Sequence, residues 1–203
     1  MRNGAAVISV IDYGAGNLHS VENALRATGA AHELIRDAAS IERAIKIILP
    51  GVGHFGQMMR ELDRLELREP LVDRIKSGVP FLGVCLGLQA LFAGSEEAAE
   101  VRGLGIFKGI ARRFDASQRV PHMGWNALDR VRESRLLEGT GERPFAYFAN
   151  SYYAPVCDAA AATCEYGERF TAVIEQANIF AVQFHPEKSG AAGLRMIGNF
   201  LCL

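Results

Sequence analysis

Gly83-Val84-Cys85-Leu86-Gly87-Leu88-Gln89 is the most informative stretch of this chain, because two kinds of periodicity meet in it. The residues from Pro80 to Val84 are typical of a buried strand, and those from Leu86 to Phe92 are typical of a helix. Cys85 therefore falls at a strand-to-helix turn, with the G-x-C-x-G spacing of a nucleophile elbow. So sharp a turn strains its apex residue and needs small residues two places before and after it, which the two glycines supply.

This turn gives Cys85 a chemical environment unlike that of a packed cysteine. Unpaired backbone N–H groups and the positive end of the helix dipole favour the thiolate, which is the nucleophilic form. The N–H of Leu86 is one of these groups and is expected to form half of an oxyanion hole. The alternative is that Cys85 packs as a small apolar residue, as most free cysteines do. The flanking glycines favour the reactive interpretation.

Strand-like and helix-like segments alternate before residue 103. The strands are expected at 6–12, 31–36, 44–49 and 80–84, and the helices at 17–28, 57–66, 71–76 and 86–92. This βαβα series predicts an α/β fold in which helices cover both faces of a parallel sheet.

After residue 103 the predicted strands follow one another more closely, at 106–114, 127–131, 145–153, 169–175 and 179–184. Thr171 to Glu175 and Phe180 to Phe184 are expected to form a hairpin. Ser189 is expected to cap a final helix from Gly190 to Leu201. The residues of this helix expected to face inward are Leu194, Ile197 and Leu201. The pattern predicts a three-layer α/β structure with an antiparallel extension, in a single domain spanning 1–203.

The composition argues against several classes of function. Lys and Arg (22) balance Asp and Glu (23) to a net charge of −1, without a basic block, so nucleic acid is not an expected partner. Val79 to Ala93 is too short and interrupted to span a bilayer, and the N-terminal run lacks a signal-peptide cleavage site. The four cysteines show no zinc-site spacing, so we expect reduced thiols, no metal and a cytoplasmic location.

A thiol nucleophile needs a base, and His185 is the histidine best placed to provide one. It ends the predicted strand 180–184 and is followed by Pro186, which cannot continue a ladder, and then by Glu187. Sites in α/β sheets form at such strand ends. His185 is expected to take the proton from Cys85 while Glu187 orients the ring, which gives a Cys-His-Glu triad. Alternatively, His185 and Glu187 are only a solvated strand end.

Two further glycine-bearing loops follow predicted strands. Pro50 to Gly56 lacks the lysine and the spacing of a phosphate-binding loop, so it is either an ordinary turn or the source of a second oxyanion donor. Gly14-Ala15-Gly16 begins like a dinucleotide-binding loop, but Ser or His occupies the position of the third glycine. Neither nicotinamide nor another cofactor is therefore expected.

The segments GVCLGLQ and FHPE resemble those of the class I, triad-type glutamine amidotransferases. Four longer segments look like the glutaminase subunits of imidazole glycerol phosphate synthases: DYGAGNL at 12–18, LPGVG at 49–53, PHMGWN at 121–126 and HPEKS at 185–189. The similarity extends from the first strand to the final helix. It implies the flavodoxin-like sheet of that family.

The resemblance implies hydrolysis of glutamine to glutamate and ammonia. Cys85 would attack the side-chain amide and form a γ-glutamyl thioester, while His185 would protonate the leaving ammonia and then activate water. Gly53 would complete the oxyanion hole with Leu86. The residues implied to hold the glutamine are Gln89, Glu97, Ser151 and Tyr152.

The same resemblance implies a partner. Ammonia would pass to a cyclase subunit with a (β/α)8 barrel, in a heterodimer that makes imidazole glycerol phosphate and an aminoimidazole carboxamide ribotide for histidine biosynthesis. The residues implied to face this subunit are Asn17, Trp125, Tyr147 and Lys188. From residue type alone, Trp125 could instead pack in the core. The loop from Gly51 to Gly53 is expected to be poised only when the partner binds, so the isolated chain should be nearly inactive.

Asn150 departs from the family pattern, since histidine often precedes Ser-Tyr at this point. Asparagine is smaller and does not titrate, so a role that needs a ring or a charge is in doubt here. Two alternative functions stay open. One is a glutaminase for anthranilate or pyridoxal phosphate synthesis, which PHMGWN and HPEKS disfavour, and the other is a docking protein with an inert thiol.

Overall fold

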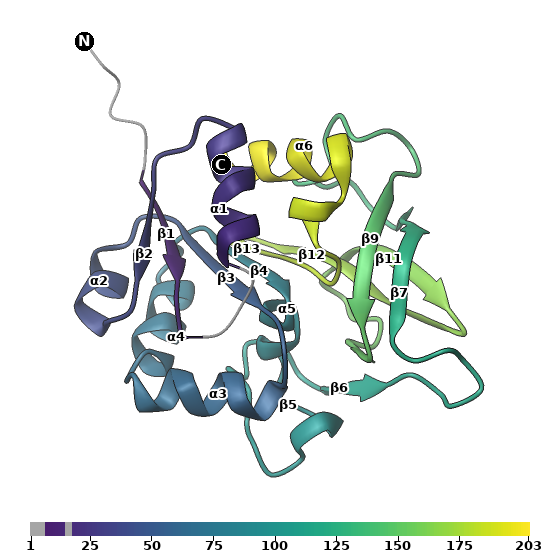
Figure 1. The fold of residues 1–203 in the computed structure, drawn as a ribbon, viewed down its shortest axis with the longest axis horizontal. Helices are drawn as coiled ribbons and strands as arrows, with labels where there is room; N and C mark the ends of the chain where they lie inside the picture. Colours follow the sequence, from purple (N-terminus) through teal and green to yellow (C-terminus); the bar gives the residue numbers. More distant parts are fainter. Residues whose placement is uncertain (1–6, 15–17) are drawn as a thin grey trace.

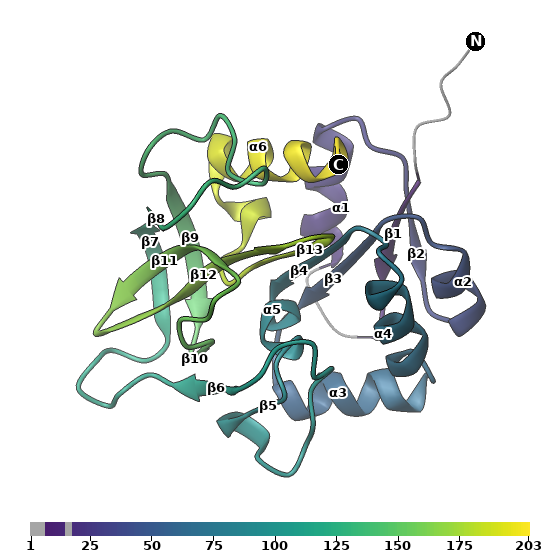
Figure 2. The same ribbon diagram turned by 180° about the vertical axis from the view of Figure 1, so that it is seen from behind.

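The computed structural model describes residues 7–14 and 18–203, and an eight-stranded sheet is its main element. The strand order is β2-β1-β3-β4-β13-β12-β11-β8 (Figures 1 and 2). The pairs among the first five strands are parallel, and the pairs beyond β13 are antiparallel. The parallel part has the order of a flavodoxin-like sheet, with β13 in the fifth position. The predicted α/β fold with an antiparallel extension is confirmed.

The bounds of the elements follow the predicted series with shifts of a few residues. The strands of the main sheet are β1 (Ile8–Ile11), β2 (His32–Ile35), β3 (Ile47–Gly51), β4 (Phe81–Cys85), β8 (Asp129–Arg130), β11 (Ala160–Tyr166), β12 (Glu168–Gln176) and β13 (Ile179–Val182). The α-helices are α1 (Leu18–Ala27), α2 (Ala38–Arg43), α3 (Phe55–Arg64), α4 (Arg68–Lys76), α5 (Leu86–Ala90) and α6 (Gly190–Leu201).

Helices cover both faces of the sheet and bury two separate hydrophobic cores. Helices α1 and α6 lie on one face, and α2, α3 and α4 on the other (Figure 1). Successive residues of β3 alternate between the cores: Ile48 joins the first, whereas Ile47 and Leu49 join the second. The sheet is thus held from both sides, which fixes the positions of its strand ends.

Two small sheets complete the fold beside the antiparallel half. One pairs β7 (His122–Ala127) with β9 (Phe145–Asn150), and the other has the order β10-β6-β5. The bounds of its strands are β5 (Gly94–Ser95), β6 (Ile110–Arg113) and β10 (Tyr152–Tyr153). The carbonyl of Tyr147 in β9 accepts a hydrogen bond from the His185 N–H at 2.9 Å. The β7–β9 sheet therefore helps to position the segment after β13.

The predicted hairpin is confirmed, because β12 and β13 pair from Val173 and Val182 to Gln176 and Ile179. The predicted strand 145–153 is interrupted at Ser151, and its two parts, β9 and β10, belong to different sheets. The structure also contains α2, β7 and β11, which the sequence pattern did not predict.

Two expectations for the last helix are wrong. The side chain of Ser189 does not cap α6. Its hydroxyl instead donates to the His185 carbonyl at 2.7 Å and accepts from the Tyr147 N–H at 2.9 Å, so both of its roles serve the neighbouring loop and strand. Leu194 is 38% exposed, whereas Ile197 is buried. The inward stripe is Gly193, Met196, Ile197 and Phe200.

Within the two described ranges, every helix is too short or too polar to span a bilayer. In the same ranges, no three His, Cys, Asp or Glu side chains gather as a metal site would require.

Candidate active site

Cys85 lies at the apex of the turn between β4 and α5, in the strained conformation expected for an elbow. Its φ is 54° and its ψ is −107°, a positive φ that residues other than glycine rarely adopt. A Cβ on Gly83 would lie 2.6 Å from the Gly87 carbonyl oxygen, and a Cβ on Gly87 would lie 2.1 Å from that of Leu49. The two glycines are therefore required by close backbone packing between the turn, the helix and β3.

The helix after Cys85 is shorter than expected, since it ends at Ala90 and not at Phe92. One and a half turns carry only a small aligned dipole, so side chains near the sulfur must contribute more to thiolate stability than the helix does. Leu86 and Gly53 both line the cavity that contains Cys85. Gly53 has a φ of +89°, which is accessible because it is glycine.

His185 and Glu187 form a buried pair next to this cysteine. Nδ1 of His185 lies 2.8 Å from Oε1 of Glu187, and the two side chains are only 5% and 2% exposed. Burial lowers the pKa of His185, but hydrogen bonding to the Cys85 sulfur and to Glu187 outweighs it and raises the pKa to about 10. The Glu187 carboxylate thus orients a charged imidazole beside the Cys85 sulfur.

Two other histidines, His122 and His54, are engaged in contacts of their own. His122 is buried and stacks on Tyr166 and Phe148, with ring centroids 4.0 and 4.7 Å apart. Burial lowers its pKa to about 4, so the ring is neutral. His54 accepts a hydrogen bond from the Gly56 N–H at 3.1 Å and caps α3.

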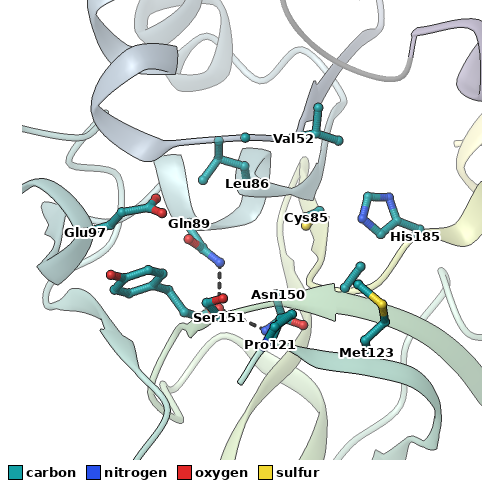
Figure 3. A pocket seen from close by; sticks show the side chains of 13 residues that line it. Val52, Cys85, Leu86, Gln89, Glu97, Pro121, Met123, Asn150, Ser151 and His185 are labelled. Carbon is teal, nitrogen blue, oxygen red and sulfur yellow. Dashed lines mark hydrogen bonds between the residues drawn. The ribbon is translucent and has the colours of Figure 1, made fainter. Parts of the chain in front are cut away.

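Cys85 and His185 line one end of a cavity of about 260 Å³, and Gln89 and Glu97 lie towards the other end (Figure 3). The residues that line it are Val52, Gly53, Cys85, Leu86, Gln89, Glu97, Pro121, Met123, Ala149, Asn150, Ser151, Tyr152 and His185. The cavity therefore contains all the residues that were predicted to bind glutamine or form the oxyanion hole. Of the predicted triad, only Glu187 lies behind the wall, as a residue that orients His185 should.

Hydrogen bonds hold the polar side chains of the cavity in defined orientations. The Tyr152 carbonyl accepts from Gln89 Nε2 at 2.8 Å and from Asn150 Nδ2 at 2.9 Å. Oε2 of Glu97 accepts from the Phe55 N–H at 2.7 Å, which ties this carboxylate to the start of α3. Asn150 thus has a structural bond that needs neither a ring nor a charge.

Of the predicted partner-facing residues that the structure describes, Trp125 and Lys188 are exposed and Tyr147 is half-buried. Trp125 is 57% exposed, so the alternative of core packing is wrong. Its ring meets that of Tyr147 edge to face, with centroids 6.1 Å apart. Lys188 is exposed. Asn17 lies outside the described residues.

Sequence reasoning missed Gln183, which is fully buried and whose Nε2 lies 3.8 Å from the Cys85 sulfur. It also missed Pro121 and Met123 as cavity residues, although both belong to the quoted segment PHMGWN. A polar residue within the apolar run before His185 was the available signal for Gln183.

Replacing Glu187 by glutamine is expected to lower the pKa of His185, because one of the two partners of the charged ring is lost. A raised histidine pKa stabilises the fold fully below about pH 6.5, and this stabilisation is lost as the pH rises through the folded value of about 10. The difference in unfolding free energy between wild type and E187Q should therefore be largest near pH 6 and shrink towards pH 10. Urea unfolding across this range measures it, and a difference independent of pH would contradict the assignment.

Comparison with known proteins identifies the class to which this fold and site belong. A family model described as "Glutamine amidotransferase class-I" matches residues 9–202. A solved structure described as "Crystal structure of glutamine amidotransferase" superimposes with a TM-score of 0.76 at 18% sequence identity, covering 98% of this chain and 100% of that one. The chain is a class I glutamine amidotransferase.

Relatives place the chain more narrowly. It is 48% identical over 196 residues to "Imidazole glycerol phosphate synthase subunit HisH" of Methanothermobacter thermautotrophicus, covering 96% of this chain and 98% of that protein. It is 46% identical over 202 residues to "Imidazole glycerol phosphate synthase hisHF, chloroplastic" of Arabidopsis thaliana, covering 97% of this chain but 34% of that protein. Within the class, the chain belongs to the family of HisH subunits.

Proposed function

We propose that this chain is the glutaminase subunit of an imidazole glycerol phosphate synthase. It hydrolyses glutamine and supplies ammonia to a cyclase subunit that makes imidazole glycerol phosphate and an aminoimidazole carboxamide ribotide in histidine biosynthesis. The main observation in support of this chemistry is the strained Cys85 beside the buried pair of His185 and Glu187. In this pair, Nδ1 of His185 lies 2.8 Å from Oε1 of Glu187. The similarity to the HisH subunits supports the choice of pathway.

The proposed reaction uses each residue for one task. The Cys85 sulfur attacks the amide carbon, and the negative charge on the oxygen is held by backbone N–H groups of Gly53 and Leu86. His185 gives its proton to the departing nitrogen, and ammonia leaves with the electron pair of the C–N bond. His185 then takes a proton from water, which attacks the thioester and releases glutamate and the thiolate.

The substrate is held at the end of the cavity away from His185. We assign the α-amino and α-carboxylate groups of glutamine to Gln89, Glu97, Ser151 and Tyr152, which all line the cavity. The Glu97 carboxylate complements an ammonium group, and backbone groups near Ser151 can bind the carboxylate. No metal or cofactor takes part in this proposal.

The proposed partner is a cyclase with a (β/α)8 barrel, forming a heterodimer in the cytoplasm. The relative from Arabidopsis thaliana is named hisHF, and this chain covers only 34% of its length. The name and the additional length support a partner that is fused to the corresponding subunit in that plant protein. Trp125, Tyr147 and Lys188 are the proposed contacts, because Trp125 on β7 and Lys188 after His185 are exposed, and the half-buried Tyr147 on β9 meets the Trp125 ring. Asn17 is a further proposed contact from the sequence.

The function is tested by mixing the purified chain with a cyclase subunit and its ribulosyl substrate. Glutamine should then support formation of imidazole glycerol phosphate, while the chain alone should turn over little glutamine. A complex that uses ammonium salts but never glutamine would reject the proposal. Activity with an anthranilate or pyridoxal phosphate synthase, and not with the cyclase, would favour the alternative amidotransferases.

Trp125→Ala is expected to weaken the complex with the cyclase by about 30-fold or more, because an exposed tryptophan at the centre of an interface typically contributes about 2 kcal/mol or more. Titration calorimetry of the two subunits measures the effect. Ile45→Ala is a matched control, since Ile45 is 56% exposed and precedes β3 at the opposite end of the strand from the site. Equal affinities of W125A and wild type would remove Trp125 from the interface.

A further inference from the structure

Gln183 is a buried carboxamide that contacts the sulfur of the elbow. It follows β13 directly, two residues before His185, and its side chain has no exposed surface. Its Nε2 lies 3.8 Å from Cys85 Sγ, and its Oε1 accepts a hydrogen bond from Gln89 Nε2 at 3.1 Å. Both polar atoms of this carboxamide are therefore engaged within the site.

The orientation of this carboxamide follows from a backbone carbonyl. Gln89 Nε2 also donates to the Tyr152 carbonyl oxygen at 2.8 Å, and a carbonyl oxygen can only accept. Gln89 must therefore present its NH2 group to Tyr152 and to Gln183. If Gln183 were turned over, two NH2 groups would face each other at 3.1 Å and an oxygen would face the sulfur. The oxygen of Gln183 thus points at Gln89, and its NH2 group points at Cys85.

An N–H group aimed at a buried sulfur favours the thiolate over the thiol. A thiolate is a hydrogen-bond acceptor with a full charge, and hydrogen bonds to charged groups are about twice as strong as those between neutral groups. The cysteine is 6% exposed, so water contributes little to stabilising its charge. His185 lines the same end of the cavity as the sulfur, so the Gln183 N–H group acts beside the imidazole.

We propose that Gln183 is a positioning residue which donates a hydrogen bond to the Cys85 thiolate, and that the Tyr152 carbonyl fixes the direction of this donor through Gln89. The proposal rests on the proposed function in that Cys85 is the nucleophile. Gln183 stabilises the thiolate before attack on glutamine and again when the thiolate leaves the thioester. The same chain of bonds connects the sulfur to two residues assigned to substrate binding.

The test measures the thiolate directly and needs neither glutamine nor the cyclase. Iodoacetamide alkylation of Cys85 in the complete chain is followed by peptide mass spectrometry from pH 5 to pH 10, in wild type, Q183M and Q183E. The midpoint is the pH at which the alkylation rate reaches half of its maximum. Gln183→Met keeps the length of the side chain and removes the donor, so at a pH below this midpoint the alkylation rate should fall by about tenfold or more. Gln183→Glu places an oxygen where the nitrogen faces the sulfur, so its midpoint should rise further.

Asn199→Leu is the matched control for loss of a structural carboxamide. Asn199 donates to the Leu136 and Glu138 carbonyls at 3.0 and 2.7 Å, on α6 and away from the sulfur. N199L should lower the melting temperature without moving the pH midpoint. Equal midpoints in wild type and a folded Q183M would overturn the proposal. If Q183M does not fold, Q183E decides, because it keeps the shape and the oxygen that accepts from Gln89.

Failure of this proposal and failure of the proposed function give different results. If the chain shows no glutaminase activity but Q183M still shifts the midpoint, the proposed function is rejected and the role of Gln183 stands. If the chain is an active glutaminase but Q183M leaves the midpoint unchanged, the proposed function stands and the role of Gln183 is rejected.

Discussion

Cys85→Ala is expected to abolish glutamine-dependent synthesis, while its complex with the cyclase continues to work with added ammonium salts. The substitution removes the only thiol among the residues that line the cavity and leaves a small side chain in the same turn. Removing the nucleophile from a comparable triad costs a factor of up to about 10⁶ in kcat, so a loss of at least about 10⁴ is expected here. The measurement is product formation by the complex with glutamine and, separately, with ammonium chloride.

The two nitrogen sources separate the roles of the subunits. If the cyclase site were incomplete without Cys85, both activities would be lost together. If the thiol were inert, both would be retained. Only loss of the glutamine-dependent activity with retention of the ammonium-dependent activity fits a glutaminase that delivers ammonia to a separate site. Thermal unfolding should confirm that C85A is folded.

Gly87→Ala is expected to destabilise the fold by about 3 kcal/mol or more, because its Cβ would lie 2.1 Å from the Leu49 carbonyl oxygen. Leu49 lies in the middle of β3 and pairs with Gly83 of β4, so its backbone cannot retreat without disturbing the centre of the sheet. Any shift of α5 instead would move the Leu86 N–H and re-aim Cys85. Urea unfolding and glutamine turnover should therefore both be impaired.

Gly198→Ala provides the matched comparison. Gly198 lies within α6, and a Cβ there would meet nothing within 4 Å. Alanine in a helix interior is favoured over glycine by up to about 1 kcal/mol, so G198A should be as stable as wild type or more stable. If G87A matched G198A in unfolding free energy, the close packing of the elbow against β3 would not be required.

The parallel half of the fold could be predicted from the sequence because the apolar runs of β1, β3 and β4 are fully buried and the helices α1 and α3 are amphipathic. What was missed there is α2, a helix of six residues with a single buried apolar side chain, Ile41. Its start is defined by Asp37, whose carboxylate accepts from the Ser40 N–H at 2.8 Å. A capping residue followed by one apolar position produces no helical periodicity.

The antiparallel half was harder because tertiary contacts override local preference there. β11 has the sequence AAATCEY, which is rich in alanine and poor in β-branched residues, yet it is buried between β12 and β8. β7 contains Gly124, with a φ of +133°, and exists as a strand because it pairs with β9 along its whole length. Pairing partners of this kind are not encoded in the local pattern.

The site shows the same division between local and non-local information. The elbow and the His-Pro-Glu segment are local patterns, and the structure brings Cys85, His185 and Glu187 together as that pattern indicated. The bonds that orient Gln183 and Asn150 depend on the Tyr152 carbonyl, directly for Asn150 and through Gln89 for Gln183. No spacing rule relates these residues, since they come from α5, β9, β10 and the segment after β13.

The most direct measurement labels the chain with an alkylating analogue of glutamine and identifies the modified cysteines by mass spectrometry. If exposure alone decided the labelling rate, the exposed Cys202 would be labelled fastest, then the half-buried Cys157, and the buried Cys85 more slowly than both. An ionised Cys85 at a glutamine site predicts a single adduct on Cys85, suppressed by excess glutamine. Labelling of Cys85 no faster than that of Cys157 or Cys202 would contradict the account.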